Sequence, residues 1–197
     1  KMKVYDVLVH LRCRFRDENY NELRFSNNEL IDYLEQMQNK IISEFGLNLQ
    51  EFVFDVGQVE LELPSECLYF YLAKCGKSKI PLKTYQEYLE NENELCIYAR
   101  SLVKYCLSLK VGQKVKVYLA LSCKLSDEND DLSIESVFVN YLVLKVMKNI
   151  LLTETNLNNL QKIELYDALI KQERNDLIAL LNRASEKRSF VTKYIKV

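Results

Sequence analysis

Apolar residues recur every three to four positions near the start of the chain, which predicts two amphipathic helices. We expect the first helix at about 3–16, with one face made by Val4, Val7, Leu8, Leu11 and Phe15. We expect the second helix at about 27–45. The polar residues at 17–22 separate them, so the two helices are expected to pack as an antiparallel pair.

The second helix carries both a start signal and a stop signal. Ser26 is a good N-cap because its hydroxyl can accept from an unpaired backbone N–H, and Glu29 can reach back to the Ser26 N–H. This reciprocal pair is a capping box. Gly46 can adopt the left-handed conformation that commonly ends a helix.

From residue 50 the apolar period changes to two, which is typical of half-buried strands. Val59, Leu61 and Leu63 alternate with two glutamates, for example. We expect a small antiparallel β region within a β-rich insertion at about 50–124. Its strands are expected at 51–56, 59–63, 67–74, 95–110 and 113–124, with a hairpin at Val111-Gly112 joining the last two.

The helical period returns after the acidic segment SDENDDLS at 126–133. A third helix is expected at about 134–152, capped by Ser133 and apolar over much of its surface, as in a central buried helix. A fourth helix is expected at about 157–187 and would be roughly 45 Å long at 1.5 Å per residue. That length exceeds a compact domain of this size, and an extended C-terminal tail follows at 189–197.

Together these elements predict a mainly helical α+β fold. It consists of an N-terminal helix pair, the small antiparallel β region, two C-terminal helices of which one is long, and the tail. We expect residues 1–188 to form a single domain.

Composition argues against several classes of function. A net charge of −1 over 197 residues does not suit a strongly basic nucleic-acid binder. The six cysteines include no C-x-x-C pair and His10 is the only histidine, so we expect no metal site and reduced cysteines in the core. The N-terminus does not resemble a signal peptide and no apolar run approaches the roughly 20 residues that span a bilayer, so a soluble intracellular protein is expected.

A search for catalytic motifs finds none, and we expect neither an enzyme nor a cofactor. The chain has no glycine-rich phosphate loop, no G-x-S-x-G and no H-E-x-x-H. The segment at 127–138 alternates acidic and amide residues as a calcium loop does, but Leu132 replaces the required glycine and Phe138 the required glutamate.

The order of elements and several short motifs resemble the head–tail adaptor, or connector, proteins of tailed bacteriophages, including the tail-tubular A type. The N-terminal likeness lies in VYDVLVHLRCRFRDENYNELRFSNNELIDYLEQMQNKI. Its aromatic-Ser/Thr-x-x-Glu-Leu-x-x-Tyr/Trp-Leu helix is represented by Phe25, Ser26, Glu29, Leu30, Tyr33 and Leu34. The runs VELELPSECLYFYLAKCGKSKIPLKTYQEYLE and SDENDDLSIESVFVNYLVLKVMKNIL extend the likeness through most of the chain.

This resemblance implies a structural virion protein that completes the head. About twelve copies would form a ring below the portal, extend the DNA channel for ejection, and offer a docking surface to a tail or nozzle protein. DNA would pass without sequence-specific binding, and no membrane would be involved. The protein would reside at the head–tail junction of the virion and in the host cytoplasm during assembly. The candidate portal-interface residues lie in the tail: Phe190, Val191, Tyr194, Ile195 and Val197.

Three alternatives stay open at this point. The tail could be a frayed terminus with no partner. The chain could be a non-viral intracellular protein–protein interaction module. Less favoured is a particle-associated cell-wall hydrolase, for which Glu60 and Glu62 would supply the paired carboxylates.

Overall fold

A computed structural model describes residues 2–15, 24–90, 94–101, 104–153 and 160–189. The chain forms two compact units, one of residues 1–38 with 124–197 and one of residues 39–123. We call them the helical unit and the β unit and describe each by itself. The assignment of 1–188 to a single domain stays a prediction.

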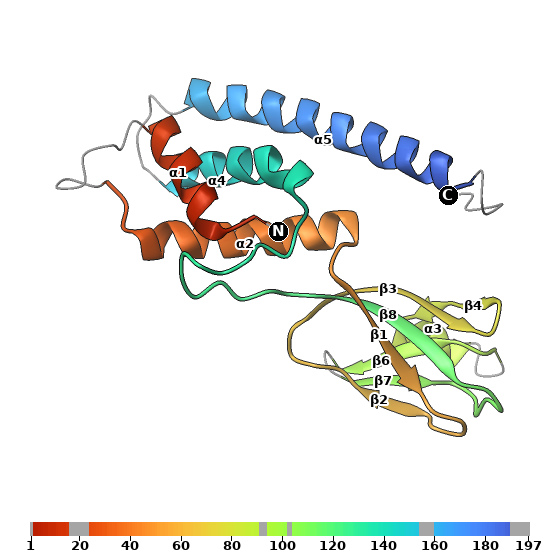
Figure 1. The fold of residues 1–197 in the computed structure, drawn as a ribbon. Helices are drawn as coiled ribbons and strands as arrows, with labels where there is room; N and C mark the ends of the chain where they lie inside the picture. Colours follow the sequence, from red (N-terminus) through yellow and green to blue (C-terminus); the bar gives the residue numbers. More distant parts are fainter. Residues whose placement is uncertain (1, 16–23, 91–93, 102–103, 154–159, 190–197) are drawn as a thin grey trace. The chain divides into compact units, whose positions relative to one another are not determined.

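Four long helices dominate the helical unit, although the last turns of α2 belong to the β unit. They are α1 (Val4–Phe15), α2 (Asn27–Phe45), α4 (Val139–Thr153) and α5 (Leu160–Ser189), and the short 3-10 helix η1 (Ser136–Phe138) leads into α4. Helix α4 packs against α5 and also contacts α1 (Figure 1). Its buried residues include Leu142, Val146 and Ile150, which makes α4 the core of this unit.

The apolar character of α4 also meets the length and composition of a membrane-spanning helix. In the described part of the chain, Ser136–Thr153 is long and apolar enough to cross a bilayer on those two criteria alone. Because 56% of this stretch is buried inside the protein, packing against neighbouring helices accounts for its composition equally well.

The acidic segment at 126–131 contacts the start of α1, and the sequence did not predict this contact. The N–H groups of Val4 and Tyr5 donate to the carbonyls of Asp130 and Glu128 at 3.0 and 2.9 Å. Lys3 Nζ lies 2.8 Å from a carboxylate oxygen of Asp131. The segment therefore satisfies N–H groups that a helix start leaves unpaired.

The predicted capping box forms at the start of α2. The Ser26 N–H donates to Glu29 Oε2 at 2.8 Å, and the Glu29 N–H donates to Ser26 Oγ at 3.2 Å. The Arg12 guanidinium donates to the Phe25 carbonyl at 3.2 Å and to Asn27 Oδ1, which ties α1 to this end of α2. Gly46 adopts φ 61° and ends the helix.

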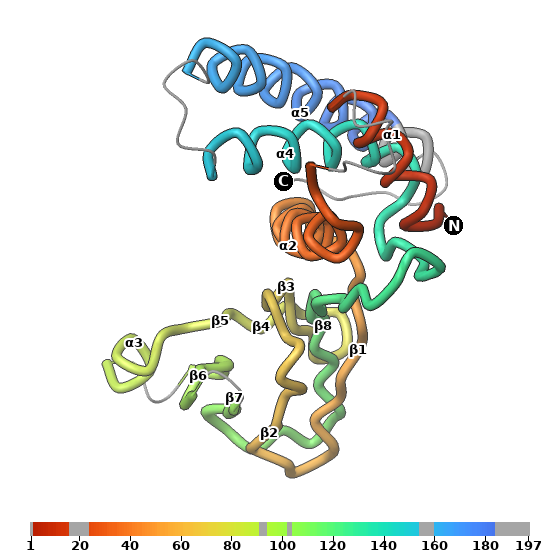
Figure 2. The backbone as a smooth tube through the Cα atoms, turned by 90° about the vertical axis from the view of Figure 1, so that its left-hand side faces the viewer, coloured from red at the N-terminus to blue at the C-terminus, as the bar shows by residue number. Residues whose placement is uncertain are grey.

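The β unit contains two four-stranded sheets that share one core (Figure 2). The first sheet has the order β1 (Leu49–Phe54), β8 (Val115–Leu121), β3 (Cys67–Cys75), β4 (Ser78–Ile80). The second has the order β2 (Glu60–Glu62), β7 (Lys104–Leu107), β6 (Ile97–Ser101), β5 (Leu82–Lys83), and the short helix α3 (Tyr85–Glu90) follows β5. Both sheets contribute to the core, with Phe54 and Val117 from the first and Ile97 and Leu107 from the second.

The prediction of a mainly helical fold is wrong. The structure is an α+β protein with two sheets, about 48% helical and 25% strand. The predicted N-terminal helix pair is also wrong as an arrangement, because the helix contact of α1 is made chiefly with α4. The sequence showed that α1 has an apolar face, and that face alone could not identify the helix that covers it.

The strand prediction fails most clearly at 95–110 and 113–124. The first of these ranges forms two strands, β6 and β7, which pair antiparallel with each other. The second forms β8, which pairs with β1 and β3 and not with its predicted partner across Val111-Gly112. Ser133 does not cap the third helix either, because Glu135 precedes η1 and makes no side-chain cap.

Candidate interface surfaces

Helix α5 packs against α4 with one narrow face. Leu177 on that face is buried, Ile163, Tyr166 and Ile170 are partly buried at helical spacing, and Lys148 of α4 pairs with Asp167. Helix α5 has 30 residues and α4 has 15, so the C-terminal part of α5 continues past the end of α4 (Figure 1). Helix α4 can therefore cover α5 over only part of its length.

Three leucines of α5 lie beside that packed face and stay exposed. Leu165, Leu169 and Leu180 fall on one side of the helix by its 3.6-residue period, with exposed fractions of 59%, 39% and 48%. We call these three residues the leucine surface. Gln172 and Asp176 lie on the same side, so the surface is apolar with polar interruptions. Such a mixture occurs on protein surfaces and in protein–protein interfaces, and not in a core.

A second exposed surface lies in the β unit, where α3 rests on β6 through tyrosine rings. Tyr88 stacks on Tyr98 with ring centroids 4.1 Å apart and planes 7° apart. Tyr85 lies tilted against Tyr98 at 5.7 Å. None of the six residues of α3 is buried. With the exposed side chains Leu82 and Leu89 these rings form what we call the tyrosine surface.

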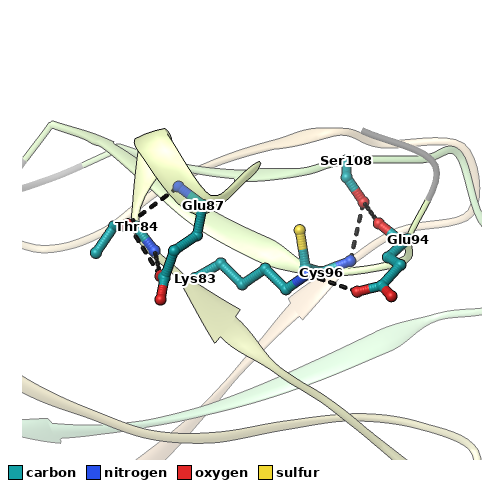
Figure 3. Close-up of polar contacts among 6 residues, drawn as sticks. All are labelled: Lys83, Thr84, Glu87, Glu94, Cys96 and Ser108. Carbon is teal, nitrogen blue, oxygen red and sulfur yellow. Dashed lines mark hydrogen bonds and ion pairs between the residues drawn. The ribbon is translucent and has the colours of Figure 1, made fainter. Parts of the chain in front are cut away.

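A polar network fixes the backbone that leads into α3 and β6, the two elements that bear the tyrosine rings (Figure 3). Thr84 and Glu87 form a second capping box, in which the Thr84 N–H donates to Glu87 Oε2 at 2.7 Å and the Glu87 N–H donates to Thr84 Oγ1 at 3.3 Å. The Thr84 N–H and the Thr84 hydroxyl both donate to the Glu87 carboxylate, and these two bonds lower its pKa. The box starts α3 immediately after β5 and so orients its rings toward β6.

The same network anchors the chain that enters β6. Lys83 Nζ lies 2.5 Å from Glu94 Oε2, an ion pair that lowers the pKa of that carboxyl. Ser108 Oγ donates to the Glu94 carbonyl at 2.6 Å and accepts from the Cys96 N–H at 2.9 Å (Figure 3). The tyrosine surface is therefore held in place before any partner binds.

Alkaline pH should weaken the packing of Tyr98. Burial, with smaller effects from Cys106 and Tyr88, raises the pKa of Tyr98 from 10.0 to about 12. The folded state therefore favours the neutral hydroxyl, and this contribution to stability is fully present below pH 10 and is lost as the pH rises toward 12. Urea unfolding between pH 9 and 12 should show this loss in the wild type and a flatter dependence in Tyr98→Phe; identical profiles would contradict the assignment.

The predicted site residues have different outcomes. Ser26 and Glu29 form their capping box, as described above. The portal-interface candidates Phe190, Val191, Tyr194, Ile195 and Val197 lie outside the described residues. The tyrosine surface was not predicted, because the short run TYQEYLE does not indicate what it packs on and its ring partner Tyr98 is distant in sequence.

The carboxylates of the hydrolase alternative are occupied in ion pairs or exposed. Glu60 lies 3.1 Å from Arg100 and 2.6 Å from Lys104, and the contact with Lys104 is the main cause of its lowered pKa. A general acid at neutral pH needs a raised pKa. Glu62 is exposed in the same strand. This geometry does not favour acid catalysis by Glu60.

Other chemistry is also sparse in the described part of the chain. There, no group of three or more His, Cys, Asp or Glu residues could hold a metal ion. None of the six cysteines forms a disulfide. A hollow of about 590 Å³ lies beside η1, and its ionisable lining residues are the carboxylates of Asp6 and Glu135.

Comparison with models of known protein families gives no match for this chain. Comparison with curated proteins gives no match either. The two exposed surfaces and the sequence motifs are therefore the features that bear on function.

Proposed function

We propose that this protein is a structural adaptor that assembles with copies of itself into a ring at the head–tail junction of a tailed bacteriophage. The observation that supports this most is the leucine surface. A 30-residue helix that leaves Leu165, Leu169 and Leu180 exposed has apolar area for another chain to cover. Burying such area is the main favourable contribution to association.

The geometry suits a contact between unlike faces. A ring requires one face of each copy to meet a different face of its neighbour. The leucine surface lies along one side of α5, and a neighbour can cover it without displacing α4, which packs on another side. About twelve copies would surround the DNA channel, in keeping with the family that the sequence resembles.

The low net charge fits a conduit for DNA. A basic lining would bind phosphates and slow ejection, whereas this chain carries a net charge of −1. We propose a portal protein and a tail or nozzle protein as partners. The portal-binding role of Phe190, Val191, Tyr194, Ile195 and Val197 stays a prediction of the resemblance.

Photo-crosslinking tests whether neighbouring copies cover α5. We would place p-benzoylphenylalanine at position 165, add the portal protein encoded in the same genome, and irradiate. We expect a species of two joined 23.2 kDa chains. The matched control carries the probe at Lys171, an exposed position on another side of α5, and should give far less product. Crosslinks to the portal alone, or equal yields at both positions, would refute the proposal.

A further inference from the structure

We propose that the tyrosine surface of one copy binds the C-terminal segment 190–197 of a neighbouring copy. This inference rests on the proposed ring, in which each copy must present one face and accept another. It assigns the segment a site on a second copy, whereas the sequence resemblance places the segment at the portal. The experiment below separates the two.

The tyrosine surface has the properties of an unfilled binding site for an extended peptide. Tyr85 is 51% exposed and Leu89 is 50% exposed, although both are held on a fixed framework. Strand β5 is the terminal strand of the second sheet, and such an edge presents backbone N–H and C=O groups. An added segment could contact the edge with its backbone and the rings with its side chains.

The charge around these rings selects the partner. Glu87, Glu90 and Glu94 all lie exposed around α3. Lys83 is paired with Glu94, and Glu87 caps its own helix. Glu90 lies at the end of α3, next to Leu89, and can receive a cation there. A partner that combines aromatic or aliphatic side chains with lysine or arginine fits this surface, and an acidic one does not.

The C-terminal segment of this chain has that chemistry. FVTKYIKV, residues 190–197, contains Phe190 and Tyr194, two lysines and no acidic residue. As a strand it would place Phe190 and Tyr194 on one face and Val191 and Ile195 on the other, with one lysine on each. Extended, it could span up to about 26 Å. This is enough to cross α3, whose six residues rise about 9 Å.

Binding between copies through this contact would be weak on its own. The contact is short, and ordering the segment opposes it. A portal that brings the copies together would raise their effective concentration and close the chain of contacts into a ring. Free protein would then stay mostly monomeric and associate only near 100 µM or above, on the order of what a small contact supports.

A mixing experiment tests the inference with the full chain. The first variant, Leu89→Ala with Glu90→Lys, alters the tyrosine surface and keeps all three rings. The second variant ends after residue 189 and keeps the surface. Each alone should stay monomeric in sedimentation velocity at about 200 µM, whereas the wild type associates. Their equimolar mixture should form dimers and nothing larger. The first variant supplies only an intact C-terminal segment, and the second supplies only an intact tyrosine surface.

Charge reversal and a matched control sharpen the result. A chain with Lys193→Glu and Lys196→Glu should lose at least about tenfold in association and recover when mixed with the Leu89→Ala/Glu90→Lys variant. The control Leu68→Ala with Glu66→Lys changes the same two residue types at other exposed positions of the β unit and should behave as the wild type. Near-ultraviolet circular dichroism checks that the rings stay packed in each variant.

The remaining outcomes overturn one proposal or the other. A wild type that stays monomeric to 500 µM, or surface variants that associate normally, would refute the segment–surface contact. If the variants with an altered tyrosine surface still form rings on the portal, the inference fails and the adaptor function stands. If no copy binds portal but the mixture dimerises, the contact stands and the adaptor function fails.

Discussion

Glutamate at positions 165 and 169 should abolish ring assembly and leave the fold intact. Each buried leucine contributes about 1.5–3 kcal/mol to a contact. The substitution removes this contribution at every contact of the ring and adds two carboxylates that would have to lose water. We therefore expect at least a hundredfold loss of association in Leu165→Glu/Leu169→Glu, which corresponds to about 2.7 kcal/mol per contact.

The folded monomer should tolerate this change. Both leucines are exposed, at 59% and 39%, and glutamate is a good helix former. The free energy of unfolding should change by about 1 kcal/mol or less. The matched control, Lys171→Glu with Asn175→Glu, alters exposed positions on another side of α5 and should assemble normally. Equal loss of assembly in both variants would show that added negative charge, and not the leucine surface, is responsible.

Replacing Leu142 with alanine should destabilise the helical unit more than any surface change discussed above. Leu142 lies in the middle of α4 with no exposed area. Leucine-to-alanine substitutions at such positions cost about 2–5 kcal/mol, because a cavity remains where the side chain was. The control is Leu152→Ala on the same helix, where the side chain is 56% exposed and the cost should stay within about 0.5 kcal/mol.

Urea unfolding followed by circular dichroism measures both α4 variants. A difference of less than about 1 kcal/mol between them would mean that α4 is not the core of the unit.

The parts of the fold that local signals specify could be predicted from the sequence. Helix α2 was expected at about 27–45 and is found at Asn27–Phe45, because the Ser26–Glu29 capping box and Gly46 mark its two ends within the chain itself. The helix expected at 157–187 is found at Leu160–Ser189, because its helical period is long and uninterrupted.

The pairing of strands could not be predicted in the same way. An alternating pattern shows that β8 buries Val115, Val117 and Leu119, but β8 takes β1 and β3 as neighbours from far along the sequence. The register of such pairs depends on packing of both sheets around a shared core. The run at 95–110 similarly gave no local sign that it divides into β6 and β7.

The two candidate surfaces also differ in how much of each could be predicted from the sequence. The length expected for the last helix already exceeded a compact domain of this size, but its three exposed leucines were identified only in the structure. The tyrosine surface required the distance between Tyr88 and Tyr98, residues of a helix and a strand that contact only in the folded β unit. The Thr84–Glu87 capping box was the one local signal available, and it marks the start of α3 without indicating what α3 packs on.

The mass of the wild-type protein bound to its portal tests the central claim most directly. We propose that one chain cannot cover its own last helix and that neighbouring copies do so. Native mass spectrometry should find single 23.2 kDa chains in dilute free protein and about twelve copies per portal complex. One or two copies per portal, or no binding at all, would contradict it.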